Sequence, residues 1–337
     1  MNSSATHPAT SGGALSWLRP KPQHVPILAT VGVFIGLYVA ASVAYDGFGS
    51  WYQFTSFFAD NATVGLIAIG MTFVILSGGI DLSVGAMVAF SSIAMGTLLV
   101  NWELSGPVAV PIVLALGLLF GCGQGLLIHV FRLPPFLVTL AGMFLARGLA
   151  LVMTPEKRVS ITDQAIYQRF SDFDLGGFTL PAVVFIGVWL FAIVVAHYRR
   201  FGRNVYAVGG DANSALLMGL PVGRTTVGVY ALSGLCAALG GVMHALGTGA
   251  GDASVAYMFE LDAIAAVVIG GTLLSGGVGY VAGTMLGVLI LGIIATVPSY
   301  QGNLNSWWTK IAVGVLLLTF IGLQRLVQRR VRVSGAH

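Results

Sequence analysis

Long apolar stretches recur along the whole chain, separated by short polar segments. They lie near residues 26–45, 61–77, 84–100, 108–130, 136–153, 181–197, 225–247, 260–276, 281–297 and 306–324. About 20 apolar residues in helical form cross the hydrocarbon core of a bilayer. The pattern therefore predicts an all-α, polytopic membrane helix bundle with about ten transmembrane segments, occupying residues 26–325.

Polar segments flank this bundle at both ends. Residues 1–25 form a tail rich in Pro, Ser and Thr, and residues 326–337 form a short basic tail. Arg19 and Lys21 precede the first apolar stretch, as in a signal peptide, and Ser42-Val43-Ala44 is a weak match to a cleavage site. The stretch is longer than a typical signal sequence, so we expect an uncleaved first helix.

Composition supports a lipid environment. Hydrophobic residues make up 56% of the chain, and Asp, Glu, Lys and Arg together make up 8%. A soluble domain carries roughly 25% charged residues. The surface of this chain must therefore be covered largely by the lipid bilayer, and we expect no nucleic-acid partner.

Basic residues predict the orientation in the membrane. If the N-terminus is cytoplasmic, alternating segments place eleven of them inside: Arg19, Lys21, Arg132, Arg199, Arg200, Arg203, Arg224, Arg325, Arg329, Arg330 and Arg332. Only Lys157, Arg158 and Arg169 fall outside, while Arg147 and Lys310 lie within segments. This bias is typical of cytoplasmic loops. We expect both termini in the cytoplasm, an external loop over 154–180 and an internal, basic loop over 198–224.

One short sequence occurs twice. Leu76-Ser77-Gly78-Gly79-Ile80 is echoed by Leu274-Ser275-Gly276-Gly277-Val278, and each follows an apolar segment of the same expected direction. The echo predicts a parallel internal repeat, although a match this short in a Gly-rich chain can also arise by chance. The Gly pairs also allow broken or re-entrant elements at these points.

Some strings in the chain resemble enzyme motifs, but the sequence around them does not support an enzyme. The two echoed strings resemble the signature peptide of ATP-binding cassette ATPases, but no lysine stands in a phosphate-binding loop. Gly277 to Ala282 resembles a dinucleotide fingerprint, yet membrane segments flank it on both sides. Cys122 and Cys236 are isolated in apolar runs and are interpreted as small buried side chains. We expect no catalytic site, no metal and no cofactor in this chain.

A few charged residues lie within or between apolar segments, where charge is costly. Asp81 either caps the following helix together with Ser83 or takes part in a transport pathway. Glu260 and Asp262 lie at the start of the eighth segment. There they either interact favourably with the positive end of the helix dipole or take part in function. Arg147 either reaches the membrane interface or forms a functional ion pair.

A family resemblance becomes visible at the first break. Residues 70–85 read GMTFVILSGGIDLSVG, a string that resembles the membrane subunit of bacterial monosaccharide ABC importers of the ribose, xylose and galactose branch. Similar strings stand at 139–143, at 206–210 and from 261 to 272, so the likeness covers residues 70 to about 325. Residues 306–314 look most like the permeases of galactofuranose importers, whereas the long N-terminal tail departs from the family pattern.

The resemblance implies a transporter subunit of the bacterial inner membrane that is not itself an enzyme. Its partners would be a second permease subunit, identical or homologous, a cytoplasmic ABC ATPase that uses the ATP, and a periplasmic sugar-binding protein. The internal loop offers a short helix that could dock on the ATPase, although an ordinary loop helix is the alternative. Its candidate residues are Gly209, Gly210, Asp211, Asn213, Ala215, Met218, Gly219 and Leu220.

On this view the sugar crosses by alternating access, along Gly-rich breaks near 76–85 and 270–279 whose backbone groups can face water. The candidate pathway residues are Asn61, Thr72, Ser77, Asp81, Ser83, Asp262, Thr272 and Ser275. The competing hypothesis is an ion-coupled secondary sugar transporter that acts alone. It would need ionisable residues deep in the membrane, of which the layout offers little besides Arg147. A non-transporting membrane scaffold is a third possibility, but no soluble signalling domain supports it.

Overall fold

A computed structural model describes residues 25–153, 158–301 and 307–334. The expected N-terminal tail lies outside these residues except for Val25, as does Lys157 of the expected external loop. The last helix continues to Ser334, so most of the expected C-terminal tail is helical, and residues 335–337 lie outside the described part.

Each of the apolar stretches contains a helix. These helices are α1 (Val25–Ala44), α3 (Ala62–Leu76), α4 (Val84–Gly96), α5 (Gly106–Phe131), α6 (Pro135–Val152), α8 (Leu180–Tyr198), α11 (Val222–Thr248), α12 (Phe259–Ile269), α13 (Val281–Gln301) and α14 (Trp307–Ser334). Shorter elements join them: α2 (Trp51–Asp60), the π-helix η3 (Thr97–Asn101), α7 (Ala165–Ser171), α9 (Arg200–Gly210), α10 (Ala212–Leu217), β1 (Arg158–Ser160), β2 (Asp174–Leu175), β3 (Phe178–Thr179) and β4 (Ala250–Asp252).

The expected count of about ten spans is not confirmed. Among the described residues, seven helices are long and apolar enough to cross a membrane, or up to eight if α2 and α3, bent by 54°, form one span. With 11 residues, α12 reaches only about 16 Å, roughly half of a bilayer core. An apolar stretch therefore predicted a helix at each place, but the helix did not always extend far enough to span.

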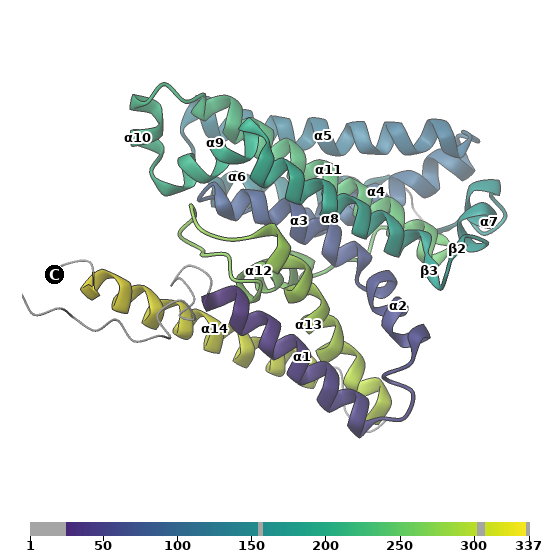
Figure 1. Cartoon of the computed structure of the whole chain (residues 1–337). Coiled ribbons are helices and arrows are strands. Elements are labelled where there is room, and N and C mark those ends of the chain that lie inside the picture. The colour runs from purple at the N-terminus through teal and green to yellow at the C-terminus, as the bar shows by residue number, and fades with distance from the viewer. Residues whose placement is uncertain (1–24, 154–157, 302–306, 335–337) are drawn as a thin grey trace, which may run out of the picture.

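The helices form two groups (Figure 1). In the larger group, α11 packs along α3, α4 and α5, while α8 packs on α3 and α6 on α4. In the smaller group, α1 and α14 pack on α13. Two helices connect the groups: α12 contacts α3, α13 and α14, and α13 contacts α3 and α8. The short helices α9 and α10 lie at one end of the molecule, and α2, α7, β2 and β3 lie at the other (Figure 1).

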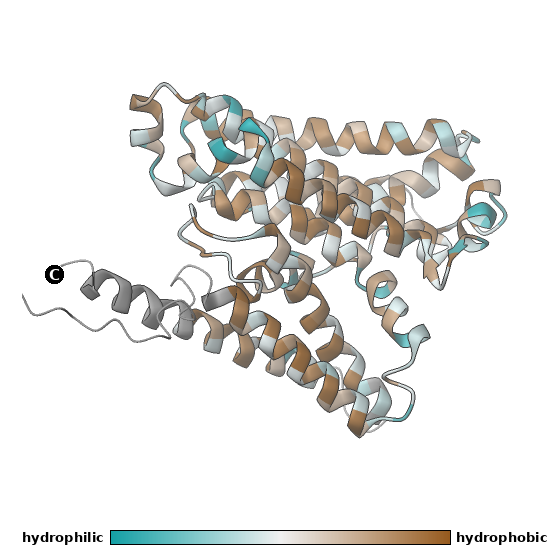
Figure 2. Cartoon of the chain, in the orientation of Figure 1, coloured by the Kyte–Doolittle hydropathy of each residue, from teal (hydrophilic) through white to brown (hydrophobic). Residues whose placement is uncertain are grey.

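Helix α3 lies in the core, whereas several other helices expose apolar surface. Residues 65–76 of α3 are all buried, which explains why this helix is apolar on every side. By contrast, Leu119 of α5, Phe144 of α6 and Phe191 of α8 are largely exposed. Figure 2 shows that hydrophobic residues predominate along the long helices. Lipid chains are the medium that suits such a surface.

Glycines permit a close helix contact between α5 and α11. A Cβ atom on Gly121 would overlap the carbonyl oxygen of Tyr230, and one on Gly234 would overlap the carbonyl oxygen of Gly117. Small residues let helix backbones approach closely within a membrane. Glycines of this chain therefore serve close packing of its helices.

The segment before α8 is folded against the bundle. Strand β1 pairs antiparallel with β4, with Arg158 opposite Asp252, and β2 pairs antiparallel with β3. The β1–β4 pair ties the segment to the stretch that leads into α12.

Candidate functional site

The two echoed sequences meet in space. The first forms the break between α3 and α4, and the second forms part of the break between α12 and α13. The backbone N–H of Gly277 donates a 2.9 Å hydrogen bond to the carbonyl oxygen of Leu76. Gly78, Gly276 and Gly277 have φ values of 83°, 80° and 72°, which favour glycine. The contact does not by itself establish an internal repeat, which stays a prediction.

The end of α9 joins the same contact. A Cβ atom on Gly209 would overlap the carbonyl oxygen of Leu76 and would lie 2.7 Å from the nitrogen of Gly277. The Tyr206 hydroxyl donates a 2.9 Å hydrogen bond to the carbonyl oxygen of Gly279. We call residues 76–78, 209–210 and 276–279 the glycine junction. It brings both helix breaks into direct backbone contact with α9.

Helix α10 follows the junction and confirms the short helix expected in this loop. A carboxylate oxygen of Asp211 accepts a 2.6 Å hydrogen bond from the N–H of Ser214. The backbone N–H and the hydroxyl of Ser214 both lower the pKa of Asp211, because they stabilise its charged form. Gly219 has a φ of 76° and ends the turn after the helix.

The exposed face of α10 differs from the expected one. Ala215 is 0% exposed and points into the protein, so it is not available to a docking partner. Leu217 is 89% exposed, and Leu216 and Met218 beside it are also exposed. Asn213 and Gly219 are exposed as well, while Leu220 is half-buried. The exposed apolar patch of Leu216, Leu217 and Met218 is the part of this loop that suits a protein partner.

Asp81 is the centre of a buried polar cluster. One of its carboxylate oxygens accepts hydrogen bonds from the N–H and the hydroxyl of Ser83, at 2.9 and 2.6 Å. The other accepts a 2.7 Å hydrogen bond from the hydroxyl of Ser233 on α11. The Ser83 hydroxyl also lies 3.2 Å from the side-chain oxygen of Gln124 on α5. The expected cap of α4 is not formed, because Ser83 is the N-cap residue but neither its side chain nor that of Asp81 bonds to the first turn. With 1% exposure, Asp81 instead ties the first break to α11; its role in transport stays a prediction.

The other expected pathway residues do not line one cavity with Asp81. Two buried hydroxyls join α3 to α13, because Thr72 and Thr284 lie 2.7 Å apart. The side-chain amide of Asn61 donates to the carbonyl oxygen of Phe57, and the Ser77 hydroxyl donates to that of Val74. Thr272 is buried against Gly279, and Ser275 is exposed in the second break. These residues lie at separate places in the fold, and their assignment to the transport pathway stays a prediction.

Charged residues from three helices gather near the start of α12. Both carboxylate oxygens of Asp262 lie 3.0 Å from the ammonium nitrogen of Lys310 on α14. The Arg147 guanidinium of α6 donates to the carbonyl oxygens of Ala253 and Val255, at 3.2 and 2.8 Å. The sequence suggested the membrane interface or an ion pair for Arg147, but among the described residues its hydrogen-bond partners are these backbone carbonyls. The pairing of Lys310 with Asp262 was not predicted. The only sequence signal was that both cations lie inside apolar segments.

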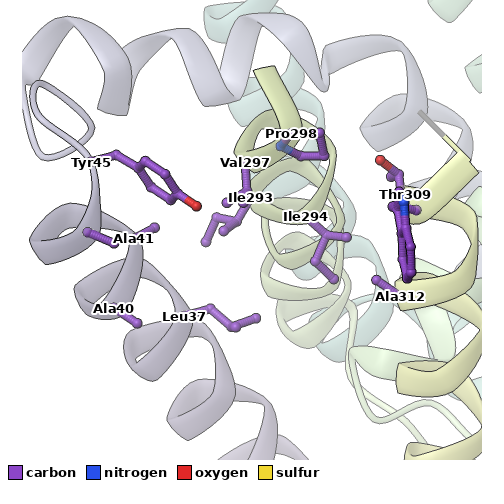
Figure 3. A pocket seen from close by; sticks show the side chains of 12 residues that line it. Leu37, Ala40, Ala41, Tyr45, Ile293, Ile294, Val297, Pro298, Thr309 and Ala312 are labelled. Carbon is purple, nitrogen blue, oxygen red and sulfur yellow. The ribbon is translucent and has the colours of Figure 1, made fainter. Parts of the chain in front are cut away.

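An apolar pocket of about 520 Å³ lies between α1, α13 and α14 (Figure 3). Leu37, Ile293, Ile294, Val297 and Ala312 point into it. A site for a polar small molecule needs a few polar groups that fix its orientation. The lining of this pocket suits hydrocarbon instead, so it is not a candidate for a polar ligand.

Comparison with known proteins identifies the family. Residues 53–321 match the family model described as branched-chain amino acid transport system / permease component. The chain is 46% identical to the inner membrane ABC transporter permease protein YjfF of Escherichia coli K12, over 90% of this chain and 92% of that protein. It is 37% identical to the fructose import permease protein FruG of Bifidobacterium longum, over 90% and 92% of the two chains.

A third relative is the ribose import permease protein RbsC of Bacillus subtilis, 36% identical over 89% of this chain and 94% of that protein. No solved structure matches the chain significantly. The matched region contains the glycine junction, the Asp81 cluster and the charged residues at α12. These relatives are permease subunits rather than enzymes. The chain therefore belongs to the family of branched-chain amino acid transport system permease components, and it is a multi-pass membrane transport subunit.

Proposed function

We propose that this chain forms one half of the transport pathway of a bacterial ABC importer for a monosaccharide. The observation that carries the proposal is the contact of α9 with both helix breaks, directly beside the exposed apolar face of α10. This arrangement lets a partner bound to α10 act on two breaks at once. Relatives named as fructose and ribose import permeases support a sugar as the substrate class.

In the proposed orientation, the end with α9 and α10 faces the cytoplasm. The basic residues of this region are Arg199, Arg200, Arg203 and Arg224. Such residues are enriched in cytoplasmic loops. The start of α1 and the C-terminal end of α14 lie toward the same end of the molecule (Figure 1). Both termini are then cytoplasmic, and α2 and α7 face the periplasm and its sugar-binding protein.

Coupling follows from what α10 exposes. A cytoplasmic ABC ATPase takes up Leu216, Leu217 and Met218 in an apolar groove, as grooves on other proteins take up short helices. ATP binding favours one arrangement of the two ATPases and so biases the permease between inward-open and outward-open states. The rigid contact at Gly209 transmits the movement of α9 to both breaks. A second permease subunit completes the pathway.

Within the monosaccharides, galactofuranose is the sugar that we propose to test first, because residues 306–314 resemble permeases of galactofuranose importers. The alternative, an ion-coupled transporter that acts alone, is less favoured because the relatives are named as ABC transporter or import permeases. Affinity purification from the native membrane followed by mass spectrometry tests the assembly. We expect an ABC ATPase and a second permease subunit to co-purify, whereas an isolated chain that transports sugar in liposomes would contradict the proposal.

A matched pair of variants tests the docking face. Leu217→Glu places a charge on the exposed face of α10, and we expect loss of ATPase co-purification and of sugar uptake with normal membrane insertion. Leu175→Glu is the control, because Leu175 is also an exposed leucine but belongs to β2 at the opposite end. It should retain the ATPase. If Leu217→Glu also retains the ATPase and wild-type uptake, the coupling assignment is wrong.

A further inference from the structure

The charged residues at the start of α12 come from three separate helices. Arg147 belongs to α6, Glu260 and Asp262 to α12, and Lys310 to α14. Asp262 and Lys310 form an ion pair at 3.0 Å, and Glu260 lies within electrostatic range of Arg147, Asp262 and Lys310. The Arg147 guanidinium stands 4.2 Å from the centre of the Tyr257 ring. We call these five residues the α12 cluster.

Helix geometry places the cluster about 5–8 Å from the ends of two membrane helices, on the periplasmic side in the proposed orientation. Arg147 lies five residues before the end of α6, and Lys310 lies three residues after the start of α14. At the other end of α12, the carbonyl oxygen of Ile269 accepts a 2.6 Å hydrogen bond from Thr30, which is about one turn into α1. Glu260 lies nine residues before Ile269, about 13 Å away along the axis of α12 at 1.5 Å per residue.

The segment that leads into the cluster is not helical. Between β4 and α12, Ala256 and Met258 have φ values of 59° and 66°, which side chains other than glycine rarely adopt. Irregular backbone at membrane depth is tolerated where it lines a water-filled cavity or is buried in protein. Here it leads to an exposed side chain, because the Tyr257 residue is 60% exposed. The segment therefore holds the Tyr257 ring at the surface of the chain.

Exposure separates this cluster from the buried one around Asp81. The Lys310 side chain is 44% exposed, and Arg147 and Glu260 are only half-buried. Charged side chains near the ends of membrane helices reach the interface or face a water-filled cavity or a partner, rather than the hydrocarbon core. The outer surface of the α12 cluster therefore faces water at the periplasmic mouth of the permease, or a partner subunit there.

The chemistry of the cluster suits a sugar. Arg147 covers one face of the Tyr257 ring, and the exposed remainder of the ring offers an apolar platform for the C–H face of a sugar. Two carboxylates and two cations provide both acceptors and donors for hydroxyl groups. Two positive and two negative groups add up to no net charge, so the site does not favour an ionic ligand over a neutral one.

We propose that Arg147, Tyr257, Glu260, Asp262 and Lys310 form a sugar-contact site on the permease pathway, and that its ligand is a neutral monosaccharide. This inference rests on the proposed function of the chain. It assigns the contact to an aromatic ring with carboxylates and cations around it, instead of to the Gly-rich breaks. The sugar passes the ring after it leaves the binding protein.

Transport by the complete reconstituted importer tests the contact. For Tyr257→Ala we expect the maximal uptake rate to fall about tenfold, as expected from the loss of one aromatic contact. The sugar concentration at half-maximal uptake, set mainly by the binding protein, should change less than twofold. Tyr257→Phe keeps the ring and should retain most of the uptake. Phe191→Ala is the control, because Phe191 is 65% exposed on α8, outside the cluster.

Thiol labelling distinguishes the path from a subunit interface. In a background with Cys122→Ala and Cys236→Ala, Tyr257→Cys should react with a charged thiol reagent, and saturating sugar should slow the reaction. Phe191→Cys should stay unlabelled. Cross-linking of Tyr257→Cys between two permease subunits, without labelling, would overturn the contact site and assign this face to the interface.

The two proposals fail in different ways. If the wild-type importer takes up sugar but Tyr257→Ala leaves the uptake rate unchanged, only the contact site is wrong. If the wild-type complex hydrolyses ATP but takes up no monosaccharide, the proposed function itself is wrong and the contact site falls with it.

Discussion

The backbone nitrogen of Gly277 lies 2.9 Å from the carbonyl oxygen of Leu76, so the second helix break is hydrogen-bonded to the end of α3. Gly209 at the end of α9 packs on both partners of this bond. Three segments that are far apart in the sequence therefore share one backbone contact. Movement of any one of them must either displace the other two or break the contact.

Gly209→Ala should disrupt the glycine junction. The new Cβ atom would overlap the carbonyl oxygen of Leu76, and relief of such overpacking costs about 1–3 kcal/mol. We expect a lower thermal unfolding temperature of the detergent-solubilised complex and reduced sugar uptake per assembled complex. Gly210→Ala is the control, because nothing lies within 4 Å of its Cβ position. Equal effects of the two variants would contradict the role of the junction.

Asp81→Ala should destabilise the fold. It leaves the Ser233 hydroxyl and the Ser83 N–H without their acceptor in a buried site, at about 1–3 kcal/mol for each unsatisfied group. Asp252→Ala is the control, because Asp252 makes the same type of bond to the N–H of Ser254, but at an exposed position. Thermal unfolding of the two variants in detergent measures the difference.

The same variant separates the two roles that were open for Asp81. If Asp81 acts only in structure, the uptake rate per correctly assembled Asp81→Ala complex stays at the wild-type level. A rate that falls further than the amount of assembled complex would assign Asp81 to the transport pathway as well.

A double-mutant cycle at Thr72 and Thr284 should show a favourable coupling between α3 and α13. The Thr72 hydroxyl donates to the carbonyl oxygen of Ala68, so Thr284 donates to Thr72 across the 2.7 Å contact. Thr72→Val leaves the Thr284 donor unpaired and should cost about 1–2 kcal/mol. The double Val variant should be more stable than the sum of the single effects predicts. Additive effects in unfolding measurements would exclude the coupling.

Asp211→Ala should loosen α10, because it removes the acceptor of the Ser214 N–H. We expect faster hydrogen exchange at that N–H and weaker binding of the ATPase, whereas Asp211→Asn keeps a cap and should resemble wild type. The pKa of Asp211 is lowered in the folded protein. Its stabilising effect is therefore present above the ordinary carboxyl pKa of about 4 and is lost as the pH falls below it. If hydrogen exchange at the Ser214 N–H is as slow in Asp211→Ala as in wild type, the cap is excluded.

The positions of the helices could be read from the sequence because lipid imposes a strong requirement for apolar segments. The number of spans could not, since a helix crosses only if nothing ends it early. Helix α12 ends after only 11 residues, directly before Gly270. A 54° bend separates α2 from α3. Helix α2 itself was not predicted, because its mixture of aromatic and polar residues gives no apolar stretch.

The candidate site was predictable only in part. The short helix was predicted from local sequence, because the cap at Asp211 that begins it depends on residues only three positions apart. The buried side of α10 did not follow, because packing against α9 and α11 decides that Ala215 points inward. Asp81 was singled out for its charge, but its partner Ser233 lies 152 residues away.

The sequence by itself determined that the chain lies in a membrane, where its helices form and where glycine interrupts them, because these properties depend on composition and on near neighbours. Only the tertiary structure decided that the two interruptions touch each other and Gly209, and that Arg147, Asp262 and Lys310 gather at the start of α12. These contacts join residues far apart in the chain. They depend on how all the intervening helices pack, which no local pattern specifies.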